Sequence, residues 1–166
     1  TTATEKISQE SCAKLVGRCF AEATGSDVAL ISLGTWISGN GTNQNNDSVS
    51  GKLYAKNITD YDICTILPTG WSQTIKTIRL TGKQIQALYK EGYDAVGTGK
   101  NYPYMLVNPE DMKLEDGKTY QVAISGISEK QASETEVTDS GIVGMDAAKE
   151  FFGQFETLSE ADAEWK

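Results

Sequence analysis

The types of residue that could perform chemistry are few in this chain. Its 166 residues include no histidine, which excludes imidazole general bases, Ser-His-Asp triads and histidine-ligated metal sites within it. Its three cysteines, Cys12, Cys19 and Cys64, are too few for a four-cysteine zinc site and odd in number for a disulfide framework. The carboxylates in the predicted loops follow no EF-hand spacing, so we expect solvated acids and helix caps there. We therefore predict no catalytic residue, metal site or cofactor in this chain.

Aromatic residues are the strongest sign of binding chemistry. Trp36, Trp71, Tyr102 and Tyr104 each stand in a predicted loop or at a predicted strand end, where ligand sites concentrate. Their faces suit flat ligands such as nucleobases or sugar rings. Taken singly, each is expected to lie at the rim of the core, whereas the group indicates a binding role. The sequence GTGK at 97–100 lacks the upstream glycine of a phosphate-binding loop, and we interpret it as an ordinary loop.

Composition and charge limit the partners. A chain of this length with 39% hydrophobic and 23% charged residues predicts one globular domain, residues 1–166, with a proper core. The net charge of −8 argues against a nucleic-acid partner and against adsorption to an anionic membrane. No apolar run approaches the ~18 residues of a membrane helix. Because the chain begins with Thr1 rather than Met, we interpret it as excised from a longer protein.

The first half of the chain predicts a helix and a buried strand. Ser8 is a good N-cap and Gly25 a good stop signal, and the apolar residues between them, Cys12 and Cys19 among them, recur at helical spacing. Residues 28–31 form a continuous apolar run typical of a strand buried on both faces. We expect residues 1–7 to be a frayed lead-in and residues 38–51 to be a polar loop.

The second half predicts a mixture of strands and helices. We expect a helical segment at 61–67, a strand at 72–80, a helix after the capping box at 81–84, and strands at 105–107 and 120–124. Residues 94–103 and 126–141 are expected to be loops, 142–152 a helix, and Ser159 the cap of a last short turn. Helices and strands mix without strict alternation, so the predicted fold class is α+β, with a mixed sheet and flanking helices.

Three segments carry a resemblance to a known family. They are ESCAKLVGRCFAEATGSDVALISLG at 10–34, NITDYDICTILPTGWSQTIKTIRLTGKQIQALYKEG at 57–92, and DGKTYQVAISG at 116–126. In this order they resemble the C-terminal domain of the 5′-nucleotidase (UDP-sugar hydrolase / 2′,3′-cyclic phosphodiesterase) family. The resemblance covers most of the chain, with an insertion around 38–51, and implies the fold of that domain.

The resemblance also implies that a second domain carries out the catalysis. In the family, an N-terminal metallophosphoesterase domain holds two divalent metals, and the C-terminal domain binds the nucleoside part of the substrate. This chain would then be the substrate-binding half, and its partners would be that N-terminal domain and a nucleotide or related phosphate ester. An extracellular, cell-surface or periplasmic location is implied by the same resemblance.

The family's binding residues are poorly matched. A phosphate-contacting arginine is expected near Ile37, and the two base-stacking phenylalanines are replaced within Pro68-Thr69-Gly70-Trp71 and near Ile127. Because two tryptophans stand in the altered segments, they are candidates for a rebuilt aromatic site. The predicted substrate-binding residues are Gly34, Trp36, Thr69, Gly70 and Trp71.

Three functions follow as hypotheses. The first is the substrate-recognition domain of a phosphohydrolase acting on nucleotides or related phosphate esters. The second is a non-catalytic binding or spacer module that kept the fold and lost the nucleotide site. The third is a hydrolase of different specificity, such as one for cyclic nucleotides or sugar nucleotides.

Overall fold

The computed structural model describes residues 1–34, 48–94, 101–127 and 134–166. In chain order the elements are β1 (Thr2–Ala3), α1 (Gln9–Thr24), β2 (Val28–Ser32), α2 (Asp60–Ile66), β3 (Thr74–Thr81), α3 (Gly82–Glu91), β4 (Tyr93–Asp94), β5 (Asn101–Tyr102), β6 (Tyr104–Val107), β7 (Thr119–Ile124), β8 (Val137–Val143), α5 (Gly144–Gly153), β9 (Thr157–Leu158) and the 3-10 helix η1 (Glu160–Ala163).

A five-stranded mixed sheet organises the molecule, with the strand order β6-β2-β7-β3-β8. The central strands β2 and β7 run parallel, with Leu30 opposite Ile124. The other pairs in this sheet are antiparallel. All five residues of β2 are buried, because helices cover the sheet on both of its faces. The predicted α+β fold with a mixed sheet and flanking helices is therefore confirmed.

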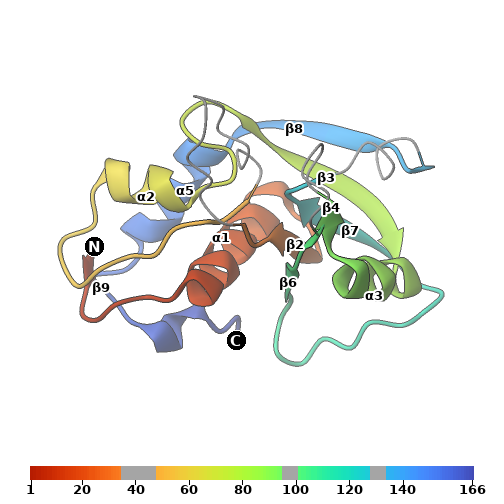
Figure 1. Ribbon diagram of the computed structural model, residues 1–166, viewed down its shortest axis with the longest axis horizontal. Coiled ribbons are helices and arrows are strands. Elements are labelled where there is room, and N and C mark those ends of the chain that lie inside the picture. Colours follow the sequence, from red (N-terminus) through yellow and green to blue (C-terminus); the bar gives the residue numbers. More distant parts are fainter. Residues whose placement is uncertain (35–47, 95–100, 128–133) are drawn as a thin grey trace.

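Two hydrophobic clusters lie on the two faces of the sheet. The ribbon diagram shows the helices and strands that contribute to them (Figure 1). The larger cluster joins the sheet to α1, α2 and α5, and includes Phe20 and Phe152. The smaller cluster includes Leu80, Ile85 and Tyr120, and packs α3 against the opposite face. Cys12 and Cys19 are buried in the larger cluster, as their spacing on the helix predicts.

Helix ends follow the local signals of the sequence. The Ser8 hydroxyl accepts the backbone N–H of Ser11 at 3.1 Å and begins α1, and Gly25 ends it with a φ of 64°. At α3, the Thr81 hydroxyl accepts the N–H of Gln84 at 3.2 Å, and the Gln84 side chain accepts the N–H of Thr81 at 2.8 Å. The predicted capping box is therefore present.

The prediction of a frayed lead-in at residues 1–7 is wrong. Strand β1 pairs in parallel with β9, and Ile7 is fully buried opposite Leu53. Each of these two strands has only two residues, and the partners lie more than 150 residues apart along the chain. No local sequence pattern could therefore indicate their pairing.

Two predicted loops also contain strands. Residues 94–103 include parts of the short antiparallel pair β4 and β5, and residues 126–141 contain most of β8. Strand β8 lies at the edge of the sheet, and none of its residues is fully buried. Its apolar residues, Val137, Ile142 and Val143, stand at its two ends, so the strand lacks an apolar alternation. Backbone pairing with β3 and the partly buried side chains at its two ends hold it in place.

Candidate functional site

A cavity of about 200 Å³ opens where β7 ends and β3 begins. Four separate parts of the chain form its wall: α1, the loop after α2, the start of β3, and the segment from 124 to 127. The lining residues are Phe20, Pro68, Thr69, Gln73, Thr74, Lys76, Ile124, Ser125, Gly126 and Ile127. Crevices at the carboxyl ends of strands in mixed and parallel sheets are common ligand sites.

The loop after α2 is shaped by proline and glycine. Helix α2 ends at Ile66 and is capped by Leu67, whose N–H donates to the carbonyl of Cys64 at 3.3 Å. Pro68 cannot continue the helix. Gly70 then adopts a φ of 54°, with its N–H bonded to the Leu67 carbonyl at 3.1 Å. This tight turn places Thr69 in the cavity wall and leads the chain into β3.

The opposite wall is fixed by hydroxyl groups at the ends of β2 and β7. The Ser125 hydroxyl accepts the backbone N–H of Ser32 at 3.0 Å, and the Ser32 and Ser48 hydroxyls lie 2.8 Å apart. All three serines are buried. Gly126 then turns with a φ of 67°, and its carbonyl accepts a hydrogen bond from the hydroxyl of Tyr104. The end of β7 is therefore held rigidly beside β2.

Lys76 supplies the positive charge of the wall. Its ammonium donates to the Thr74 hydroxyl at 3.1 Å and forms an ion pair with the carboxylate of Asp139 on β8. Hydrogen bonds from Lys76, and then from Thr74 and Gly141, hold the pKa of Asp139 well below its usual range. A lysine ammonium has three N–H donors, and the third donor of Lys76 has no partner among the described residues.

Thr69 shapes the cavity wall through close packing. Its side chain packs against Gly144 so closely that a Cβ at position 144 would lie 2.2 Å from Oγ1. That Oγ1 atom is buried and has no hydrogen-bond partner within the described part of the chain. An unsatisfied buried hydroxyl costs roughly 1–3 kcal/mol, which marks Thr69 as a residue whose type is not explained by stability alone.

The structure brings together only some of the residues predicted from the sequence. Thr69 lines the cavity together with Ile127, which the resemblance places near a stacking position. Gly70 provides the turn, while Trp71 is 55% exposed and does not line the cavity. Trp36 lies outside the described residues.

Gly34 lies outside the lining of the cavity. It is buried at the end of β2, where its N–H donates to the Val49 carbonyl at 3.0 Å. Its carbonyl accepts from the Gln9 side chain at 2.6 Å. In this position Gly34 anchors the chain that follows β2.

Sequence reasoning missed the polar residues of the wall. Gln73, Thr74 and Lys76 fall in the segment predicted as a strand, and Ser125 directly follows another predicted strand. The only signal was the polar character of 72–76 at the start of an otherwise β-branched run, which does not by itself indicate a site. The start of β3 and Ser125 lie close together because β3 pairs antiparallel with β7.

The arrangement can bind a ligand, but its residues do not form a hydrolytic centre. No group of three or more acidic or cysteine side chains that could hold a metal occurs among the described residues. The cavity combines apolar surfaces with one ammonium group, hydroxyls and an amide. Such a combination orients a small molecule by a few polar contacts.

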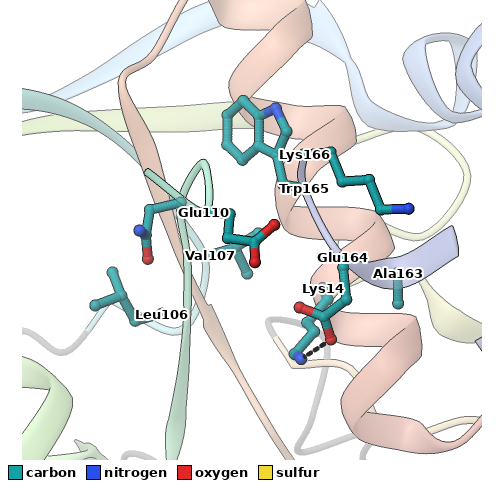
Figure 2. A pocket seen from close by; sticks show the side chains of 9 residues that line it. Lys14, Leu106, Val107, Glu110, Ala163, Glu164, Trp165 and Lys166 are labelled. Carbon is teal, nitrogen blue, oxygen red and sulfur yellow. Dashed lines mark hydrogen bonds and ion pairs between the residues drawn. The ribbon is translucent and has the colours of Figure 1, made fainter. Parts of the chain in front are cut away.

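A second cavity, of about 470 Å³, lies elsewhere, between α1, the end of β6 and the segment 163–166 (Figure 2). The ion pair between Lys14 and Glu164, 2.5 Å from Nζ to Oε1, lies in its wall. Glu110, Trp165 and Lys166 also line it, so the charges of the wall are mixed. No residue predicted from the sequence lies there, and we take the smaller cavity as the candidate site.

Comparisons with known proteins identify the fold. No family model and no curated protein sequence matches the chain. Among solved structures, the chain resembles part of larger nucleotidases. One is the 5′-nucleotidase precursor from Thermus thermophilus, with a TM-score of 0.65 and 15% identity over 95% of this chain. Another is the Haemophilus influenzae NAD nucleotidase, with a TM-score of 0.57 and 11% identity over 96% of this chain.

The match covers only a fraction of those proteins. This chain spans 37% of the Thermus protein and 35% of the Haemophilus protein. The resemblance stated from the sequence is therefore confirmed at the level of the fold, and the partial coverage fits one domain of a longer nucleotidase. Among the described residues, no helix is long and apolar enough to cross a membrane.

Proposed function

We propose that this chain is the substrate-recognition domain of a two-domain, metal-dependent phosphohydrolase of the 5′-nucleotidase type. The 200 Å³ cavity would hold the organic part of a nucleotide or related phosphate ester. Two divalent metals, bound by an N-terminal metallophosphoesterase domain, would activate water and hold the phosphate. This chain would bind and orient the substrate for that domain.

One observation carries the proposal. By the sequence resemblance, residues 68–71 and the segment near 127 stand at the places of the two stretches that supply base contacts in the family, although their residues differ, and they are separated by more than 50 residues. In the structure, Thr69 and Ile127 line the same cavity. Convergence of both stretches on one cavity is expected of a retained binding site.

The same resemblance supports the remaining parts of the proposal. The fold shared with two nucleotidases and the coverage of about a third of each fit a chain that works beside a catalytic domain. We propose an extracellular, cell-surface or periplasmic location by the same analogy.

The experiment is a thermal-shift titration of the chain with AMP, adenosine, UDP-glucose and a cyclic nucleotide. A ligand that binds only the folded state stabilises it by ~2.7 kcal/mol at 100 times its dissociation constant. We expect a saturable shift with at least one of these compounds. In Ile127→Trp, whose larger side chain fills the cavity, the shift should disappear, whereas Tyr61→Trp on the exposed surface should keep it.

A shift that survives in Ile127→Trp would remove the cavity from the proposal. A complete lack of shifts would favour the second candidate, a non-catalytic binding or spacer module. One observation favours that candidate: the only aromatic residue in the described lining, Phe20, is 1% exposed and belongs to the core. An aromatic face for a nucleobase is therefore missing from this wall.

A further inference from the structure

The size of the cavity limits what it can enclose. Its volume of about 200 Å³ is below the ~300–1,000 Å³ typical of sites for drug-sized ligands. A single ring with its substituents fits such a space better than a whole nucleotide. The cavity therefore has room for one ring, and the rest of a larger ligand would lie outside it.

The walls do not favour an aromatic ring. Pro68, Ile124 and Ile127 provide aliphatic surfaces, and Phe20 lies below them with almost no exposed area. Stacking on an aromatic side chain is worth ~1–3 kcal/mol per nucleobase, and this wall offers no exposed face for it within the described residues. A saturated ring does not depend on aromatic stacking, because it packs equally well against aliphatic side chains.

The polar groups of the wall favour oxygen atoms. The hydroxyl of Thr74 and the amide of Gln73 can bond to ligand hydroxyls, and both residues are at least partly exposed. The ammonium of Lys76 is held by Asp139 and Thr74, and has one N–H donor without a partner among the described residues. A charged donor fixed in this way bonds best to an anionic oxygen.

Together these features define a substrate class for the site, and the inference rests on the proposed function. We propose that the cavity binds a single non-aromatic ring that carries an anionic group, as sugar phosphates and sugar acids do. Lys76 is the specificity-determining residue, because its ammonium contacts the anionic oxygen. Asp139 pairs with the same ammonium, competes with the ligand anion for it, and partly neutralises its charge.

Isothermal titration calorimetry with five compounds tests this assignment: glucose 6-phosphate, glucuronate, glucose, AMP and adenosine. We expect one of the two anionic sugars to bind roughly tenfold more tightly than glucose, and more tightly than adenosine. Tighter binding of glucose 6-phosphate fits a phosphate-ester substrate, whereas tighter binding of glucuronate keeps the ring class but argues against the proposed function.

Three variants separate the role of Lys76 from general effects of charge. Lys76→Gln should abolish the preference for an anionic sugar over glucose. Lys149→Gln is the matched control, because it also removes an exposed ion-paired ammonium, 3.0 Å from Asp60, but does not line the cavity. Asp139→Asn should increase affinity for the anionic sugar, because it removes the competing carboxylate. Misfolding would lower affinity, so an increase in this variant cannot be caused by misfolding.

The outcomes distinguish this inference from the proposed function. If adenosine and AMP bind more tightly than both anionic sugars, and Lys76→Gln leaves that binding unchanged, the cavity takes a base. The substrate class is then overturned while the proposed function stands. If none of the five compounds binds, the substrate class is overturned, and the proposed function is then decided by the thermal-shift titration with UDP-glucose and a cyclic nucleotide.

Discussion

At the scale of single residues, Trp71 is the sequence-predicted contact whose role is most open to test. It follows Thr69 by two residues, is 55% exposed, and is free to pack against a part of the ligand that projects from the cavity. Trp71→Ala should therefore weaken binding of a nucleobase-containing ligand by roughly tenfold, the low end of the stacking energies in such sites. Calorimetry would measure this, with Tyr54→Ala, also a loss of an exposed aromatic ring, as the control. Equal affinities in the wild type and Trp71→Ala would exclude Trp71 from the site, which would then consist of the cavity residues alone.

The three cysteines should differ in reactivity. Burial raises the pKa of the Cys12 and Cys19 thiols to about 12, and both are almost fully buried. Burial also raises the pKa of Cys64, but this residue is partly exposed. Because the thiolate is the reacting form and needs access, iodoacetamide at pH 8 should modify Cys64 first and the other two only after unfolding. Mass spectrometry of the native protein would show this order, and early labelling of Cys12 would contradict it.

At the scale of elements, the close packing of α3 on the loop before β7 depends on Gly82. A Cβ at this position would lie 2.3 Å from the backbone carbonyl oxygen of Glu115, and a backbone atom cannot move aside without shifting the loop. Gly82→Ala should lower the free energy of unfolding by roughly 1–3 kcal/mol, the usual cost of overpacking. Urea unfolding would measure it, with Gly153→Ala as the control, because nothing lies within 4 Å of a Cβ there. A loss of the same size in both variants would mean that the close contact at 82 is not the cause.

Elements with strong local signals could be predicted, and elements defined by distant pairing could not. Ser8, Gly25 and Thr81 mark helix ends by hydrogen bonds within a few residues, so α1 and the start of α3 follow from the sequence. The apolar run at 28–31 likewise identifies β2. Strands β1 and β8 differ, since their pairing partners lie far along the chain and their side chains carry no period-two pattern.

At the scale of the whole molecule, the same distinction applies to the candidate site. Thr69 could be found from the sequence because it stands inside a recognisable stretch after Pro68. Lys76 could not, because a lysine in a strand is ordinarily a solvated side chain, and only the pairing of β3 with β7 and β8 places it in the cavity wall beside Asp139. A ligand site formed by four parts of the chain can be recognised only when the strand pairing of the sheet is known.

The pH dependence of stability should reflect the composition of the entire chain. Without histidine, no side chain with an ordinary pKa titrates between about pH 6 and 8, so the free energy of unfolding should be nearly constant there. Several carboxylates differ between the folded and unfolded states. Hydrogen bonds from Ser159 lower the pKa of Asp162, and a hydrogen bond from Lys76 lowers that of Asp139. A lowered folded-state pKa stabilises the protein above the unfolded value of ~3.9, and this stability is lost as the pH falls through the folded value.

Urea unfolding at a series of pH values would test both parts of this prediction. The wild type should show a plateau at neutral pH and a decline below about pH 4, where the unfolded state binds more protons than the folded state. Asp162→Asn should be less stable than the wild type on the plateau, because its side chain can no longer accept as a carboxylate from the Ser159 N–H and hydroxyl, each at 2.7 Å in the wild type. The difference between the two proteins should shrink in acid, as Asp162 itself becomes protonated. A difference that stays constant down to the lowest pH would show that the charge of Asp162 contributes nothing, and that packing of η1 alone explains the loss.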